Sequence, residues 1–218
     1  MEIDCLIMGA FQTNCYVLRK SGAAKACPER SRRDCLIIDA GLGARELIDF
    51  LQEHKLNPIA VVLTHGHIDH IASVAALREH YPDIKVYIHK LDAEMIASPL
   101  HNLSALAGRL FRIKPADLLV EDKSIIEQAG IRLAVLHTPG HTPGGICLYS
   151  KDEGVVFTND TLFADSVGRT DFPGGGMDEL IKSIREKLLT LPEETKVYPG
   201  HGPITTIAKE KAHNPFLQ

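Results

Sequence analysis

The chain has 218 residues, of which 44% are hydrophobic and 24% are charged, close to the averages of globular proteins. This composition excludes a disordered protein, a collagen-like fibre and a coiled coil. The net charge of −4 argues against a dedicated nucleic-acid binder, and no apolar stretch approaches the roughly 20 residues that a membrane span needs. One count is unusual, because the chain has 11 histidines and no tryptophan.

The first half of the chain alternates short apolar strands with amphipathic helices. The fourth predicted strand is a continuous apolar run, which indicates burial on both faces. We expect strands at 5–8, 15–18, 36–38, 59–63 and 86–88, and helices at 44–54 and 71–80. Residues 20–34 are basic and have no apolar period, which predicts a solvated loop or insertion, with an anion-binding patch as the alternative.

The second half repeats a similar order of elements after a mixed segment at 89–115. We expect strands at 118–120, 124–127, 131–137, 145–149, 155–158 and 196–198, and helices at 177–189 and 205–213. This order fits two sheets packed face to face with helices outside. No repeat or low-complexity linker divides the chain, so we expect a single domain over residues 1–218.

Four potential metal ligands follow the buried strand directly, in the run Thr64-His65-Gly66-His67-Ile68-Asp69-His70. His65 and His67 are two residues apart, so in extended backbone they share a face and can chelate one cation. Asp69 and His70 lie where the chain turns into the next helix and can point to a second site. Such a group would be costly to bury without partners, which favours a metal site.

Three more strands end in the same way. His141 follows the strand at 131–137, Asp160 follows the strand at 155–158, and His201 follows the strand at 196–198. Each residue lies in a loop with Gly, Pro or Asn, which allow tight backbone turns. One such loop is weak evidence, but four in one chain predict a composite site at the strand ends.

These motifs resemble those of the metallo-β-lactamase superfamily. They are T-H-x-H-x-D-H at 64–70, T-P-G-H-T at 138–142, F-T-x-D-T at 157–161 and P-G-H at 199–201. Within that family the chain is similar to glyoxalase II (hydroxyacylglutathione hydrolase) and its short bacterial forms, from residue 3 to 217 except in the basic stretch. The resemblance implies an α/β fold, namely an αββα sandwich of two mixed β-sheets with helices on both outer faces. The chain ends soon after His201, so we expect no C-terminal helical domain of the kind found in full glyoxalase II.

The resemblance also implies two divalent metal ions. The first would be bound by His65, His67 and His141, the second by Asp69, His70 and His201, with Asp160 bridging both. All these side chains offer N or O donors, which suit Zn²⁺ best, while iron and manganese are compatible. Family members usually have glycine where this chain has Asn159 and Asp165, and often Gly-Gly where it has Ile71-Ala72-Ser73. If position 159 needs a positive φ, asparagine is the best substitute.

The expected reaction is hydrolysis of a small-molecule thioester, such as S-lactoylglutathione or another S-acylglutathione. Two cations can share a hydroxide and lower its pKa toward 7, and Asp69 and Asp160 are the catalytic carboxylates. A thiolate can leave at neutral pH unaided, whereas an amine needs a general acid, and the sequence shows no acid outside the ligand set.

Other residues carry weaker expectations. Arg169 lies where glyoxalase II-type enzymes place a basic residue for glutathione, with a salt bridge to Asp171 or Asp165 as the alternative. Lys209 and Lys211 are further substrate-binding candidates, although a solvated helix face explains them equally well. Asp39 is predicted either to orient a ligand histidine or to cap the helix that begins at Ala44.

Three alternatives remain open at this point. The Val167–Phe172 run is shared with persulfide dioxygenases, which use one iron and are the first alternative. The second is a hydrolase of another activated ester or a lactone, and the third is a non-enzymatic metal-binding protein. The five cysteines form no C-x-x-C pair and Met1–Cys5 lacks a basic signal region, so we expect free thiols and a cytoplasmic location. The oligomeric state is not predicted.

Overall fold

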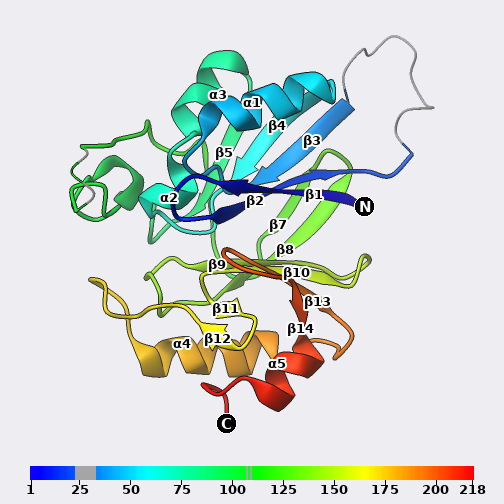
Figure 1. Ribbon diagram of the computed structural model, residues 1–218, viewed down its shortest axis with the longest axis vertical. Helices are drawn as coiled ribbons and strands as arrows, with labels where there is room; N and C mark the ends of the chain where they lie inside the picture. The colour runs from blue at the N-terminus through cyan, green and yellow to red at the C-terminus, as the bar shows by residue number, and fades with distance from the viewer. Residues whose placement is uncertain (23–32, 107, 109) are drawn as a thin grey trace.

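Two mixed sheets lie face to face, and helices cover the outer face of each (Figure 1). The computed structural model describes residues 1–22, 33–106, 108 and 110–218. The predicted αββα sandwich is therefore confirmed. No helix in these ranges is long and apolar enough to cross a membrane.

The first sheet has six strands in the order β1-β2-β3-β4-β5-β6. Their bounds are β1 Glu2–Met8, β2 Thr13–Arg19, β3 Arg33–Ile38, β4 Leu56–Val62, β5 Lys85–His89 and β6 Leu118–Val120. Strands β3 to β6 run parallel, while β1 and β2 add an antiparallel edge. The helices α1 (Ala44–Glu53) and α3 (Val74–His80) pack on the outer face of this sheet.

The second sheet has six strands in the order β14-β13-β10-β9-β8-β7. Their bounds are β7 Ile125–Gln128, β8 Ile131–His137, β9 Ile146–Ser150, β10 Val155–Asn159, β13 Lys196–Pro199 and β14 Thr205–Thr206. Only the β10–β13 pair is parallel. Its outer face is covered by α4 (Met177–Ser183), its π-helical continuation η3 (Ile184–Leu188) and α5 (Ile207–His213).

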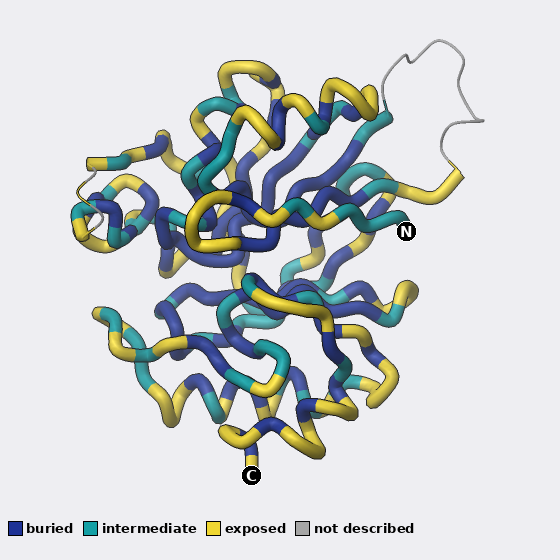
Figure 2. The backbone as a smooth tube through the Cα atoms, in the orientation of Figure 1, coloured by how far each residue is buried: buried dark blue, intermediate teal, exposed yellow. Residues whose placement is uncertain are grey.

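Alternation along the strands builds three apolar layers. In β3, Cys35 and Ile37 face the helices, whereas Leu36 and Ile38 face the opposite sheet. In β10, Phe157 likewise points between the sheets and Val156 points to α4. Successive strand side chains point to opposite faces, so strands buried on both faces are apolar throughout, as predicted for β4. Figure 2 shows this buried interior running through both sheets.

Several boundaries differ from the sequence predictions. Strand β4 begins at Leu56, earlier than predicted, and includes Pro58. Proline has no N–H to donate to a neighbouring strand, and the register between β3 and β4 shifts beside Pro58. The predicted helix at 71–80 is two helices, α2 (Ile68–Ile71) and α3, separated by Ala72 and Ser73. A short hairpin of β11 (Leu162–Phe163) and β12 (Ser166–Val167) was not predicted. Among the described residues of 90–115, the one helical element is the 3₁₀ turn η2 (Met95–Ala97). Of the predicted basic loop at 20–34, residues 23–32 lie outside the described part, and β3 already begins at Arg33.

One set of hydrogen bonds fastens the two sheets together at the edge where the candidate ligands lie. The Asn14 side-chain amide donates to the Pro199 carbonyl at 3.0 Å, and the Tyr16 hydroxyl donates to the same oxygen at 2.6 Å. The Asn14 backbone N–H donates to the Gly200 carbonyl at 2.7 Å. Strand β2 of the first sheet thereby holds the loop that carries His201.

Leu36 tests the layer between the sheets. Leu36→Ala should lower the free energy of unfolding by about 2–5 kcal/mol, because it leaves a cavity at a fully buried position. The measurement is urea denaturation of the purified protein. Leu119→Ala is the matched control, because Leu119 is 60% exposed and its loss should change the free energy by less than about 0.5 kcal/mol. Equal effects of the two changes would contradict this placement of Leu36.

Candidate metal centre

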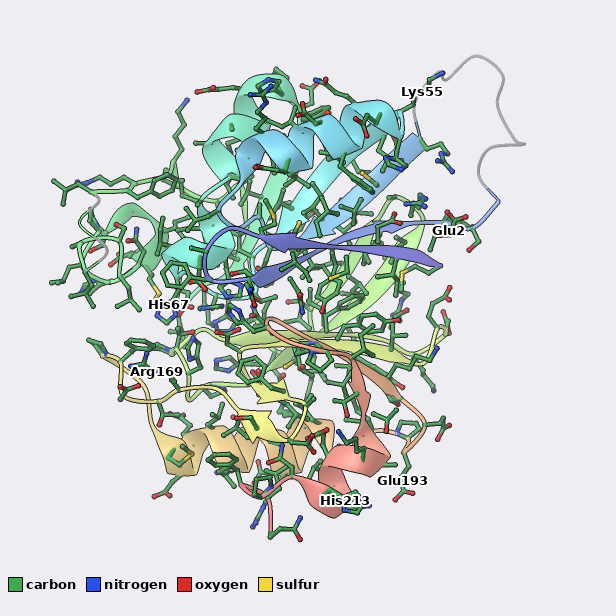
Figure 3. The ribbon with its side chains drawn as sticks, in the orientation of Figure 1. Glu2, Lys55, His67, Arg169, Glu193 and His213 are labelled. Carbon is green, nitrogen blue, oxygen red and sulfur yellow. The ribbon has the colours of Figure 1, made fainter. Side chains whose placement is uncertain are left out.

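Loops at one edge of the sandwich bring together all seven residues that the sequence proposed as ligands. His65, His67, Asp69 and His70 come from the turn between β4 and α2. His141, Asp160 and His201 come from the loops after β8, β10 and β13. Figure 3 shows His67 and Arg169 at this edge, one from each half of the sandwich.

The first group is formed by His65, His67 and His141. The His67 Nδ1 atom lies 3.0 Å from His65 Nε2 and 2.9 Å from His141 Nε2. All three side chains are buried. Three converging imidazole nitrogens are a donor set that divalent transition metals accept.

The second group is formed by Asp69, His70 and His201. The Asp69 Oδ2 atom lies 3.3 Å from His70 Nε2 and 3.4 Å from His201 Nε2. The ligand atoms of each group all lie within 4.8 Å of one another. His65, His70 and Asp160 form a third such group.

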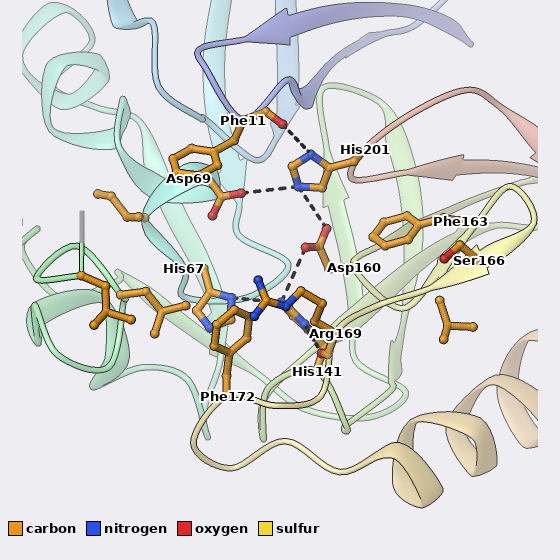
Figure 4. Close-up of a pocket in the computed structure, with 14 residues that line it drawn as sticks. Phe11, His67, Asp69, His141, Asp160, Phe163, Ser166, Arg169, Phe172 and His201 are labelled. Carbon is orange, nitrogen blue, oxygen red and sulfur yellow. Dashed lines mark hydrogen bonds and ion pairs between the residues drawn. The ribbon is translucent and has the colours of Figure 1, made fainter. Parts of the chain in front are cut away.

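Asp160 lies between the two groups and faces both. Its Oδ2 atom is 3.6 Å from His141 Nε2, while its Oδ1 atom is 3.5 Å from His70 Nε2 and 3.6 Å from His201 Nε2 (Figure 4). One carboxylate therefore presents one oxygen to each group.

Three observations fit metal ions at these positions. Ligand atoms about 2.0–2.1 Å from a tetrahedral zinc ion lie about 3.3–3.4 Å apart, and the spacings above bracket that value. Among the described residues, His70 Nε2 and Asp160 Oδ1 are buried without a hydrogen-bond partner, although buried polar atoms normally have one. The cluster can therefore hold metal ions.

The third observation concerns the far nitrogen of each imidazole. His70 Nδ1 faces Asp39 Oδ2 at 3.1 Å, His141 Nδ1 faces the Arg169 carbonyl at 2.7 Å, and His201 Nδ1 faces the Phe11 carbonyl at 3.0 Å. An Nδ1–H group in each ring can donate to the facing oxygen, which orients the ring with Nε2 toward the cluster. Such partners are typical of histidines that ligate metals.

Burial and neighbouring charge set the protonation of the cluster. Burial, together with His141 beside it, lowers the pKa of His67 to about 3, so its nitrogen is free to bind a cation at neutral pH. Burial alone would raise the pKa of Asp69, but His70 and His201 outweigh it and hold that pKa below its usual value. Burial would lower the pKa of His70, yet Asp69 and Asp160 raise it. The lowered pKa keeps the Asp69 carboxylate ionised, and an ionised carboxylate is a suitable ligand for a cation.

Asp39 connects these groups, and the structure decides between its two predicted roles. Its carboxylate accepts from the Thr64 N–H at 2.9 Å, from the Thr64 hydroxyl at 2.8 Å and from the Asn159 amide at 2.8 Å, in addition to His70. Gly43, not Asp39, precedes α1 as its N-cap. Asp39 therefore orients a histidine of the cluster and does not cap the helix.

The residues that replace family glycines fit their positions. Asn159 has φ +44° and Asp165 has φ +59°, so both positions do need the left-handed backbone that asparagine and aspartate tolerate. Ser73 donates its hydroxyl to the Gly41 carbonyl, and its N–H bonds the Ala40 carbonyl at 2.8 Å. These contacts tie the start of α3 to the end of β3.

Sequence reasoning missed Asp92, a fully buried carboxylate between two of the ligand loops. Its Oδ2 accepts from the Gly66 N–H at 3.2 Å and from the Thr142 hydroxyl at 2.8 Å, and its Oδ1 accepts from the Gly144 N–H at 2.6 Å. Gly66 separates His65 from His67, and Thr142 follows His141. A lone aspartate in the mixed 89–115 segment has no motif, so no sequence signal marks this role.

The three predicted substrate-binding cations are all paired with acids. Arg169 lines the cavity beside the cluster, and its guanidinium makes a bidentate contact to Asp171 at 3.0 and 2.7 Å. Lys209 contacts Asp165 at 2.8 Å and Lys211 contacts Glu193 at 3.1 Å. Neither lysine is among the residues that line the cavity.

Comparison with known proteins places this arrangement in a family. Residues 8–201 match the model of the metallo-beta-lactamase superfamily. The chain belongs to this superfamily. It is 39% identical over 211 residues to the probable metallo-hydrolase YqgX of Bacillus subtilis, covering 96% of this chain and 94% of that protein. It is 35% identical over 226 residues to the hydroxyacylglutathione hydrolase GloC of Haemophilus influenzae, covering 100% and 98%.

Solved structures in the superfamily share the whole fold. The B3 metallo-beta-lactamase BLEG-1 superposes with a TM-score of 0.90 at 40% identity, covering 100% of both chains. TTHA1623 in a di-iron-bound form gives 0.83 at 35% identity, covering 98% and 100%. ETHE1 from Myxococcus xanthus gives 0.78 at 29% identity, covering 99% and 84%.

The role of Asp92 can be tested by replacing its carboxylate with an amide. Asp92→Asn should weaken metal binding about 10–100-fold, because an amide cannot accept from all three donors and its own N–H would face one of them. The measurement is competition of the protein with a chromogenic chelator for zinc. Asp165→Asn is the matched control, since Asp165 is exposed and asparagine also tolerates its positive φ. Unchanged zinc affinity in Asp92→Asn would show that Asp92 does not position the ligand loops.

Proposed function

We propose that this superfamily member is a dinuclear metal-dependent hydrolase that cleaves a thioester, the substrate class to which S-lactoylglutathione and other S-acylglutathiones belong. The observation that carries the proposal is the placement of Asp160, whose two oxygens each face one group of three donors within 3.6 Å. A carboxylate in this position is suited to bridge two cations.

In this proposal His65, His67 and His141 hold the first metal ion, and Asp69, His70 and His201 hold the second. The donors are nitrogen and oxygen only, which suits Zn²⁺ and is compatible with iron or manganese. When bound, two such ions supply Lewis acidity and ionise a water near neutral pH. The di-iron form of TTHA1623 supports two ions in a site of this family.

The residues of the chain then orient the reacting groups. Asp69 stays ionised because its pKa is lowered, and it accepts the proton of the attacking water. The Thr13 hydroxyl donates to Asp69 Oδ2 at 3.4 Å and orients that carboxylate.

The leaving group favours a thioester over an amide. A thiolate leaves near neutral pH without protonation, whereas an amine requires a general acid. Among the described residues that line the cavity, every carboxylate and imidazole belongs to the proposed ligand set. The relative GloC is named as a hydroxyacylglutathione hydrolase, and this name also supports a thioester substrate.

Asp160 tests the two-metal arrangement. Asp160→Ala should lose bound metal and thioesterase activity together, because the two donor groups lose their shared carboxylate. The measurements are metal content by elemental analysis and the rate of thioester cleavage. Asp49→Ala, at an exposed position of α1, should retain both. Full activity in Asp160→Ala would refute the bridging role.

A persulfide dioxygenase with a single iron is the second candidate. The Val167–Phe172 run resembles that of those enzymes, and its Val167, Arg169 and Phe172 side chains line the cavity. The likeness to ETHE1 over 99% of the chain keeps this candidate open. Hydrolysis of another activated ester, a lactone or a β-lactam is the remaining reading of the same centre.

Metal content and oxygen uptake separate these candidates. Protein purified without oxygen should hold about two metal ions and cleave thioesters without consuming oxygen, because all seven donors converge. The measurements are elemental analysis, thioester hydrolysis and an oxygen electrode with glutathione persulfide. One iron with persulfide-dependent oxygen uptake would instead establish the dioxygenase.

A further inference from the structure

A cavity of about 570 Å³ opens beside the metal-ligand cluster, a size that suits one small organic ligand. Apart from the ligand side chains, its wall is largely apolar and comes from the β1–β2 turn, the loop after η2, the β11–β12 hairpin and the loop after β12 (Figure 4). The apolar side chains used below are Phe11, Leu103, Leu106, Phe163, Val167 and Phe172.

Some of this apolar surface is left open to solvent. Phe11 is 53% exposed and Leu106 is 75% exposed. Large apolar side chains that gather at an open cavity mark a site for an apolar ligand. The cavity is continuous with the cluster, because five of the candidate ligands line it, namely His67, Asp69, His141, Asp160 and His201.

The loop that carries Leu103 and Leu106 is fastened to the metal-ligand helix. Asn102 is fully buried, and its carbonyl accepts from the Ile68 N–H at 2.8 Å, between His67 and Asp69 in sequence. Its side-chain amide donates to the Phe111 carbonyl at 3.0 Å. Leu103 has φ +65°, a conformation that a leucine holds only when its surroundings impose it. The loop is thus built to keep these leucines at the cavity.

The positive charge of Arg169 beside the cavity is paired with the carboxylate of Asp171. Arg169 is the one arginine or lysine side chain among the described residues that line the cavity. Asp171 occupies its guanidinium from one side, and the Phe172 ring lies 4.5 Å from its central carbon. Glutathione carries two carboxylates, and the described wall offers them no unmatched cation.

We infer that the preferred substrate is a thioester with an apolar acyl group, on a thiol carrier that needs no carboxylates, and not S-lactoylglutathione. The inference rests on the proposed thioesterase function and specifies its substrate class. The acyl chain lies against the leucine and phenylalanine side chains while its carbonyl faces the cluster.

Four matched thioesters test both halves of this statement. They combine a hexanoyl or a lactoyl group with glutathione or N-acetylcysteamine, which has no carboxylate. On either carrier, kcat/KM should be at least about tenfold higher for hexanoyl than for lactoyl, since each buried methylene adds discrimination. Changing the carrier should alter kcat/KM less than about threefold. Preference for S-lactoylglutathione would overturn the inference and leave the thioesterase proposal intact.

The cavity wall is tested by a leucine variant. Leu106→Asn should lower the hexanoyl-to-lactoyl ratio of kcat/KM about tenfold, because it replaces an apolar contact by a polar one. Leu119→Asn, at an exposed leucine of β6, should leave the ratio unchanged. An unchanged ratio in Leu106→Asn would show that this wall does not contact the acyl group.

A binding measurement separates this inference from the reaction. S-hexylglutathione and S-methylglutathione are thioethers and cannot be hydrolysed, so calorimetry reports their affinity alone. We expect the hexyl compound to bind at least about tenfold more tightly. Equal affinities would overturn the inference. Failure of all four thioesters to react would refute the thioesterase, while tighter hexyl binding would still support an apolar ligand.

Discussion

The buried carboxylate of Asp39 is the contact on which both halves of the site depend. It lies at the end of β3 in the first sheet and accepts hydrogen bonds from Thr64, His70 and Asn159. Thr64 begins the ligand run after β4, whereas Asn159 ends β10 in the second sheet. One acceptor thus fixes a loop of each sheet and sets the direction of an imidazole. A buried carboxylate is costly without such donors, so the surrounding residues stabilise Asp39 as much as it positions them.

The cluster itself combines groups that are unfavourable to bury separately. Burial lowers the pKa values of His65 and His67, whereas Asp69 and Asp160 raise that of His70. The neutral imidazoles of His65 and His67 and the ionised carboxylate of Asp69 together form a donor set that suits cations. Cations would satisfy both groups at once, and this explains why His70 and Asp160 keep buried atoms without hydrogen bonds.

The cavity divides sharply between a polar floor and an apolar wall. The floor supplies ligands for cations, while the wall is formed by loops that are themselves held by buried polar side chains such as Asn102. Asp92 has the same role below the surface, where it joins the loop of His65 and His67 to that of His141. Rigid polar anchors therefore position both the chemistry and the apolar surface that surrounds it.

The sequence by itself determined the layers and predicted the seven candidate donors. Continuous apolar runs identify strands buried on two faces, and each candidate donor follows a predicted strand, where loops of one edge converge. Features that depend on partners distant in sequence were decided by the tertiary structure alone. The two-residue strands β11 and β12 are too short to show a periodic pattern in the sequence. Pro58 lies within β4, beside a shift in the register between β3 and β4. The role of Asp92 and the apolar wall of the cavity arise from segments far apart in the chain or from contacts without a motif, so local pattern cannot show them.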